Sequence, residues 1–139
     1  VGVDLAEGML ALADERDVYG DLYVGEAVAF MADWDEAPFD LIVAADVWPY
    51  LGDLAPFAAA AAACLAPSGC IIASSERGTA DFAVTPTQRF AHSTGYVREV
   101  LEVAGFDVLA VEPITVRHEE GVPVVGDLVL AKSRGKRTS

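Results

Sequence analysis

Two strand-like segments close this chain, and too few residues separate them for the strands to run parallel. Phe106–Val116 and Val124–Ala131 are rich in apolar and β-branched residues, and seven residues, 117–123, lie between them. A parallel connection within one sheet needs a crossover of about a dozen residues or more. The two segments therefore predict an antiparallel hairpin with its turn at Glu119–Gly121.

Upstream of this hairpin, apolar runs alternate with helical patterns, which is typical of a mostly parallel sheet covered by helices on both faces. Strands are expected at residues 1–3, 22–25, 39–45 and 70–74, and helices at 7–16, 54–65 and between Ser93 and Gly105. Asp53 and Ser93 suit the N-caps of two helices, and Gly105 suits a helix end. The segment 76–89 has no clear period and is expected to be a loop.

These elements predict a Rossmann-like, doubly wound α/β domain with a mostly parallel sheet that ends in an antiparallel hairpin. We assign the domain to residues 1–132 and a basic tail to residues 133–139. The chain has 139 residues, of which 53% are hydrophobic, so one domain with a sizeable core is available.

Charge and cysteine content exclude several classes of partner. The net charge of −13 repels phosphate backbones, which disfavours a nucleic-acid partner. No apolar run is long enough to predict a membrane span. Cys64 and Cys70 have neither metal-ligand nor disulfide spacing, and no other cluster of metal ligands appears. We therefore expect a cytoplasmic protein with reduced thiols, no metal and a small-molecule partner, and a homo-oligomer is compatible with the sequence.

Acids follow predicted parallel strands at the sheet edge where doubly wound domains bind nucleotides. Asp4 could accept hydrogen bonds from the ribose hydroxyls of an adenosyl group, or it could cap the helix behind it. Glu26 could accept from an adenine amino group while the Ala27 amide donates to the ring, or it could be an ordinary loop acid. Leu5 and Met9 follow Asp4, and Met9 could pad the adenine or belong to the core.

A third acid, Asp46, closes the longest apolar run. The rings of Trp48 and Tyr50 follow it and could form a rigid wall for a ligand, although Trp48 could equally pack beneath the next helix. His92 precedes a helix and has Arg89 close by in the sequence. It could serve as a general base or help to bind a substrate carboxylate, and a capping or packing role is the alternative.

In this order and spacing, the segments resemble the class I S-adenosylmethionine-dependent methyltransferases over nearly the whole chain. GVDLAEGML is similar to that family's second strand with its ribose acid, and VGEA is similar to its adenine-contacting segment. FDLIVAADVWPYLGD resembles the fourth-strand motif, and LAPSGCIIASSE resembles the fifth strand. TPTQRFAHSTGYVREVLEVAGFDV and the closing antiparallel strands resemble the late part of the family.

The resemblance implies S-adenosylmethionine as cofactor and methyl transfer to a small-molecule acceptor as the reaction. By this resemblance Asp4 would hold the ribose, Glu26 and Ala27 the adenine, and Asp46 with Val47 would face both cofactor and acceptor. The residues assigned to the cofactor are Asp4, Leu5, Met9, Glu26, Ala27, Asp46 and Val47. The residues assigned to the acceptor are Trp48, Tyr50, Arg89 and His92, with His92 or Asp46 as the catalytic base.

One part of the family's pattern is absent from this chain. The family's first strand, and the glycine-rich turn that holds the methionine end of the cofactor, have no counterpart in the sequence. Because that strand is central in the family's sheet, we expect a gap between the strands at 1–3 and 39–45. Residues upstream of Val1 are expected to supply the strand, and without them the chain is not expected to bind the cofactor.

Two other functions fit parts of the sequence. An NAD-dependent oxidoreductase would use Asp4 on its own ribose in the same way, but the closing hairpin argues against that class. A non-catalytic partner subunit would use the acidic surface and the hairpin segment GVPVVGD as an interface. Fold resemblance by itself does not establish catalysis.

Overall fold

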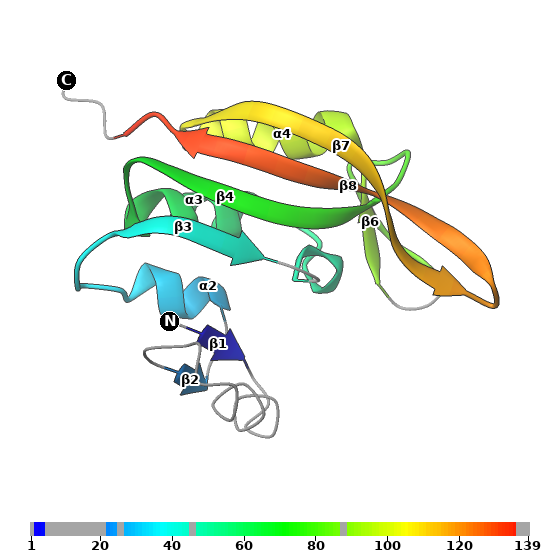
Figure 1. Cartoon of the computed structure of the whole chain (residues 1–139), viewed down its shortest axis with the longest axis horizontal. Helices are drawn as coiled ribbons and strands as arrows, with labels where there is room; N and C mark the ends of the chain where they lie inside the picture. Colours follow the sequence, from blue (N-terminus) through cyan, green and yellow to red (C-terminus); the bar gives the residue numbers. More distant parts are fainter. Residues whose placement is uncertain (1, 5–21, 25–26, 45–46, 87–88, 136–139) are drawn as a thin grey trace.

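The computed structural model describes residues 2–4, 22–24, 27–44, 47–86 and 89–135. The strands are β1 (Gly2–Asp4), β2 (Leu22–Val24), β3 (Phe39–Ala44), β4 (Leu65–Arg77), β5 (Phe82–Val84), β6 (Phe90–His92), β7 (Phe106–Glu119) and β8 (Val122–Ser133). The helices are α2 (Ala27–Ala32), the 3-10 turn η1 (Trp48–Tyr50), α3 (Ala55–Cys64) and α4 (Thr94–Ala104). Figure 1 shows these elements as an α/β arrangement, which confirms the predicted fold class.

The larger sheet has the strand order β5-β6-β4-β8-β7, and β3 also pairs with β4. β3 and β4 run parallel. β8 is antiparallel to both β4 and β7, so the predicted closing hairpin is confirmed. Its turn places Glu120 (φ 49°) and Gly121 (φ 80°) in the left-handed region, as a two-residue hairpin turn requires.

A second, two-stranded sheet pairs β1 with β2 in parallel, with Asp4 opposite Val24. Within the described residues β1 does not pair with β3, and β3 pairs with β4 alone. In Figure 1, α2 lies between β3 and the β1–β2 pair. The predicted gap between the first strand and β3 is therefore confirmed, and one edge of β3 is left open.

The core lies on one face of the larger sheet, where α3 and α4 pack behind β4, β8 and β7 (Figure 1). On that face Ile71 of β4 and Val129 of β8 are fully buried. On the opposite face Leu41 and Val43 of β3 are 50% and 63% exposed. The helices of the described ranges thus cover one face of this sheet, whereas the sequence predicted cover on both.

The capping signals in the sequence locate α4 as expected but miss the N-cap of α3. The Ser93 hydroxyl accepts a hydrogen bond from the Tyr96 amide at 3.2 Å, and Gly105 (φ 104°) ends α4. The N-cap of α3 is Leu54 rather than the predicted Asp53, and it has no side-chain cap bond. The Asp53 carboxylate, one residue earlier, accepts from the Ala55 amide at 2.9 Å.

Other parts differ from the prediction or fall outside it. The expected loop at 76–89 contains the end of β4 and all of β5, which pairs with β6. The sequence did not indicate α2 or η1. The helix expected at 7–16 lies outside the described residues.

The predicted basic tail and free thiols can be compared with the structure. β8 extends to Ser133, and the Arg134 guanidinium donates to the Glu102 carbonyl at the end of α4 at 2.6 Å, so the first part of the tail is bound to the domain. Cys64 and Cys70 are both free thiols, the first buried and the second half-buried. No helix in the described part of the chain has the length and apolar character needed to span a bilayer.

Candidate functional site

Parallel pairing brings the carboxyl ends of β3 and β4 to one edge of the sheet, followed there by η1, β5 and β6. This is the edge where doubly wound domains place their ligands. The backbone of Asp4 ends β1 beside β2. Four other predicted site residues lie outside the described ranges, namely Leu5, Met9, Glu26 and Asp46.

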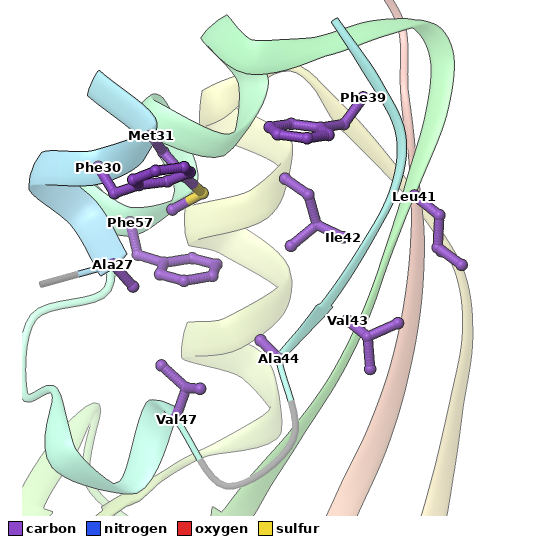
Figure 2. Close-up of a pocket in the computed structure, with 10 residues that line it drawn as sticks. All are labelled: Ala27, Phe30, Met31, Phe39, Leu41, Ile42, Val43, Ala44, Val47 and Phe57. Carbon is purple, nitrogen blue, oxygen red and sulfur yellow. The ribbon is translucent and has the colours of Figure 1, made fainter. Parts of the chain in front are cut away.

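A cavity of about 160 Å³ follows the open edge of β3. Ten apolar side chains from α2, β3, the segment before η1, and α3 line it: Ala27, Phe30, Met31, Phe39, Leu41, Ile42, Val43, Ala44, Val47 and Phe57. Figure 2 shows Leu41 and Val43 on the side of β3 opposite to Ile42, so the cavity wraps around the strand edge.

Two of the residues that line this cavity, Ala27 and Val47, are ones that the sequence assigned to the cofactor. Ala27 begins α2, and Val47 lies past the end of β3. Both line the cavity, and Figure 2 shows them near the end of β3 that carries Ala44. Most of this all-apolar lining lies along the unpaired edge of β3, in the gap that the family's absent first strand would occupy. Only its end, where Ala27 and Val47 lie, is next to the predicted cofactor residues, and two apolar side chains there are compatible with contact to a flat, uncharged ring such as adenine.

Sequence reasoning missed the part of this lining that the helices supply. Phe30 and Met31 lie on α2, and Figure 2 shows Phe57 of α3 near them. A short apolar helix AVAFMA was the available signal, but six residues are too few for a clear helical period.

Tyr50 and Arg89 come from segments 39 positions apart and meet at this edge. The Arg89 guanidinium lies 5.9 Å from the centre of the Tyr50 ring, within cation–π range. The Tyr50 side chain is 59% exposed, so its ring is available to a ligand. The structure thus brings together two of the four residues that the sequence assigned to the acceptor.

Trp48, the third of the four, is buried in the core. It is 1% exposed and contacts the Phe57 ring edge-on, with centres 5.9 Å apart and planes at 84°. This position corresponds to the alternative in which Trp48 packs beneath the following helix. Its indole nitrogen is buried and has no hydrogen-bond acceptor among the described residues.

His92, the fourth, is fully buried at the end of β6. Its Nε2 lies 2.8 Å from the Leu51 carbonyl and 3.0 Å from the Gly52 carbonyl, so Nε2 carries the proton and donates to both. Burial lowers the pKa of His92, opposed by the two bonds to carbonyls, and the ring is neutral at neutral pH. The proton-accepting atom is then Nδ1, which is enclosed and has no hydrogen-bond partner among the described residues. This geometry favours a positioning role, and the assignment of His92 as base stays a prediction.

Tyr96 completes the surroundings of His92, and sequence reasoning had placed it only on the apolar stripe of α4. The two rings are stacked, with centres 6.0 Å apart and planes at 12°. The Tyr96 hydroxyl accepts from the Leu54 amide at 2.9 Å and donates to the Asp53 carboxylate at 3.2 Å. Burial is the main cause of a raised pKa for Tyr96, so the hydroxyl stays protonated and can donate.

A buried carboxylate, that of Asp127, connects β8 with β4 and with the start of α4, the helix that carries Tyr96. Asp127 of β8 is 1% exposed and accepts from Arg77 of β4 at 2.5 Å and from the Thr94 hydroxyl of α4 at 2.7 Å. The bond to Asp127 raises the pKa of Arg77. Among the described residues, no three His, Cys, Asp or Glu side chains are grouped as metal ligands.

The sequence and the fold were each compared with those of known proteins. Residues 1–73 match the sequence model of a family described as a methyltransferase domain. The sequence matches no curated protein. Among solved structures, the fold is similar to an S-adenosylmethionine-dependent methyltransferase from Methanosarcina mazei, with a TM-score of 0.73 and 14% identity over 97% of this chain and 82% of that one.

Two further solved structures share the fold but differ in reaction. One is the 1,6-didemethyltoxoflavin-N1-methyltransferase of Burkholderia thailandensis, bound to 1,6-didemethyltoxoflavin and S-adenosylhomocysteine (TM-score 0.70, 18% identity, 94% of this chain and 59% of that one). The other is the cyclase SpnF (TM-score 0.75, 15% identity, 97% of this chain and 66% of that one). At these identities the likeness shows the fold, and the reaction has to be argued from the site.

Proposed function

This chain belongs to the methyltransferase domain family, and on that premise we propose that it transfers a methyl group from S-adenosylmethionine to a small-molecule acceptor. The observation that carries the proposal is that Ala27 and Val47, two residues that the sequence assigned to the cofactor, lie together near the end of β3 that carries Ala44. Ala27 and Val47 would hold the adenine there. Asp4, at the end of β1, would bind the ribose, and Glu26 the adenine amino group.

When bound, S-adenosylmethionine supplies a methyl group made electrophilic by the sulfonium charge. The contribution of this chain is then to align the acceptor with that methyl group and to exclude competing orientations. Alignment by fixed side chains accounts for a large part of the rate in reactions of this kind. Asp46 remains a predicted base for acceptors that must lose a proton.

The acceptor that best suits the described residues is a planar molecule with a negatively charged or acidic group. The exposed Tyr50 ring supports a stacked aromatic system, and the Arg89 guanidinium beside it supports an anion. A guanidinium also lowers the pKa of an acidic acceptor group, which favours its deprotonated, nucleophilic form. The net charge of −13 opposes polyanions such as nucleic acids.

Calorimetric titration of the full-length protein with S-adenosylmethionine and, separately, with NAD tests the cofactor. We expect binding of the first and none of the second. Heat only from NAD would replace the proposal with an oxidoreductase, and heat from neither would support a non-catalytic subunit.

The acceptor chemistry has its own test, with 2-naphthoate as a planar carboxylate probe. We expect Arg89→Met and Tyr50→Leu each to weaken its binding by about tenfold, through the loss of a hydrogen bond to a charged group in the first and of an aromatic stacking contact in the second. Arg98→Met is the matched control, because Arg98 is an exposed residue of α4. Equal binding by all four proteins would show that the acceptor site lies elsewhere.

A further inference from the structure

The segment Leu51–Leu54 connects η1 to α3 and is held by two side chains from the other side of the site. His92 donates to the carbonyls of Leu51 and Gly52 at 2.8 and 3.0 Å. Tyr96 accepts from the Leu54 amide at 2.9 Å. Three consecutive peptide groups of this segment are therefore bound by two stacked rings.

The same segment is continuous with η1, so its position determines that of Tyr50. Within η1 the Tyr50 amide bonds to the Val47 carbonyl at 3.1 Å, and the Leu51 amide bonds to the Trp48 carbonyl at 2.9 Å. Leu51 thus donates backward into η1 and accepts from His92. A displacement of Leu51 would carry the Tyr50 ring with it.

The two elements that carry His92 and Tyr96 are held by contacts outside η1. His92 lies on β6, which pairs with the end of β4, and Tyr96 lies on α4, whose first residue, Thr94, is bound to the buried Asp127. The Asp53 carboxylate accepts from the Tyr96 hydroxyl at 3.2 Å and from the Ala55 amide at 2.9 Å. β6 and α4, which carry His92 and Tyr96, therefore hold the Leu51–Leu54 segment from outside η1.

We propose that His92 and Tyr96 are positioning residues for the transfer reaction, because they fix the Leu51–Leu54 segment and, through it, the acceptor-facing Tyr50. The inference rests on the proposed function for the role of Tyr50. It assigns to His92 a donor role at Nε2, in place of a proton-accepting role at Nδ1. Neither residue touches the acceptor in this arrangement, since His92 is fully buried and Tyr96 is turned toward Leu54.

Two substitutions of His92 separate these roles. A glutamine amide can occupy the place of Nε2 and donate, whereas an asparagine amide is shorter and matches the place of Nδ1. We expect His92→Gln to retain the position of η1 and His92→Asn to lose it. A catalytic base at Nδ1 would be lost in both variants.

Trp48 supplies the readout, because it belongs to η1 and is 1% exposed. The chain has two tryptophans, so a Trp34→Phe background makes Trp48 the sole indole fluorophore. We expect acrylamide to quench Trp48 more strongly in His92→Asn and Tyr96→Phe than in the background protein, and equally in His92→Gln and the control Arg98→Gln. Far-ultraviolet circular dichroism identifies a variant that fails to fold, and Tyr96→Phe, which keeps the ring, then decides the result.

Binding of 2-naphthoate connects the position of η1 with the acceptor. We expect about tenfold weaker binding in Tyr96→Phe and His92→Asn, and unchanged binding in His92→Gln. Unchanged quenching in Tyr96→Phe, or weaker probe binding in His92→Gln with unchanged quenching, would overturn the inference. If the unsubstituted protein does not bind the probe, the acceptor proposal fails, while the quenching results still decide whether the two residues position η1.

Discussion

Asp127 illustrates at the residue scale how one side chain holds several elements together. A carboxylate that is 1% exposed is stable only when its oxygens are paired, and here one oxygen accepts from Arg77 and the other from Thr94. The three residues belong to β8, β4 and α4. Loss of the carboxylate would therefore loosen the helix that carries Tyr96.

We predict that Asp127→Ala lowers the free energy of unfolding by about 1.5–3 kcal/mol, the range for hydrogen bonds to a charged group. The Arg77 side chain is 43% exposed and can be rehydrated, which keeps the cost below that of stranding a fully buried charge. Asp107→Ala is the control, because the Asp107–Arg134 pair is exposed on both sides and such pairs contribute about 0–1 kcal/mol. Urea denaturation measures both variants, and equal losses would contradict the special role of Asp127.

The buried neutral His92 predicts a loss of stability in mild acid. Its pKa in the folded protein is lowered mainly by burial, so the unfolded chain takes up the proton first as the pH falls. The contribution of neutral His92 is complete above the unfolded pKa of about 6.5 and decreases as the pH falls below it. Tyr96 stacks on its ring, and the Asp53 and Asp81 carboxylates act on Tyr96. On the neighbouring strand β4, the charged residue Arg77 is paired with His92.

Urea midpoints between about pH 7 and pH 5.5 measure this effect, because this window spans the ordinary histidine pKa and lies above that of most carboxylates. We expect the midpoint to fall with pH in the unsubstituted protein and to fall less in His92→Gln. His118 is exposed, so His118→Gln should leave the slope unchanged. If the urea midpoint of His92→Gln falls with pH as steeply as that of the unsubstituted protein, groups other than His92 cause the pH dependence.

Sequence reasoning could predict some contacts of the site and not others, for a physical reason. Tyr50 and Arg89 were assigned to the acceptor because aromatic and cationic residues near strand ends suit ligands, and the structure brings these two side chains together. The role of Tyr96 could not be found, since its partners Asp53 and Leu54 lie more than 40 positions away. Which carbonyls His92 meets likewise depends on tertiary packing that no local pattern records.

At the scale of elements, the contact between β8 and β4 depends on a residue without a side chain. A Cβ atom on Gly126 would overlap the Ser75 carbonyl oxygen and lie 2.6 Å from Cγ1 of Val116. The Ser75 oxygen is backbone and cannot rotate away. The long hairpin can therefore approach the central strand closely only with glycine here.

We predict that Gly126→Ala destabilises the domain by about 1–3 kcal/mol, as overpacked cores do. Gly95→Ala is the matched control, because a Cβ there meets nothing within 4 Å and alanine favours the helix, so its stability should be unchanged or rise by about 0.5–1 kcal/mol. Thermal denaturation compares the two. A Gly126→Ala protein as stable as the parent would mean that β8 shifts without cost.

Elements with strong local signals were predictable, and the short ones were not. The caps Ser93 and Gly105 located α4, and the short connection located the hairpin of β7 and β8. β5 and β6 have three residues each, too few to show a two-residue period. The pairing of β5 with β6, and of β6 with β4, exists only in the folded chain. The gap beside β3 followed from the family resemblance rather than from any local pattern.

For the whole molecule, an open apolar strand edge favours association between copies of the chain, and a high net charge opposes it. Leu41 and Val43 of β3 are 50% and 63% exposed beside an edge that pairs with no described strand. Such edges recruit strands from other copies. The charge of −13 per chain repels other copies over a distance that shrinks as salt is added, to about 10 Å at 0.1 M.

We therefore predict that this polypeptide self-associates as the salt concentration rises, and that sedimentation velocity will show the increase in mass. Val43→Lys should suppress the association, because a lysine beside the edge strand blocks pairing. Val103→Lys adds the same charge at an 84% exposed position of α4, far from β3 in the sequence, and should leave the association unchanged. If both lysine variants suppress it equally, net charge rather than the strand edge controls association.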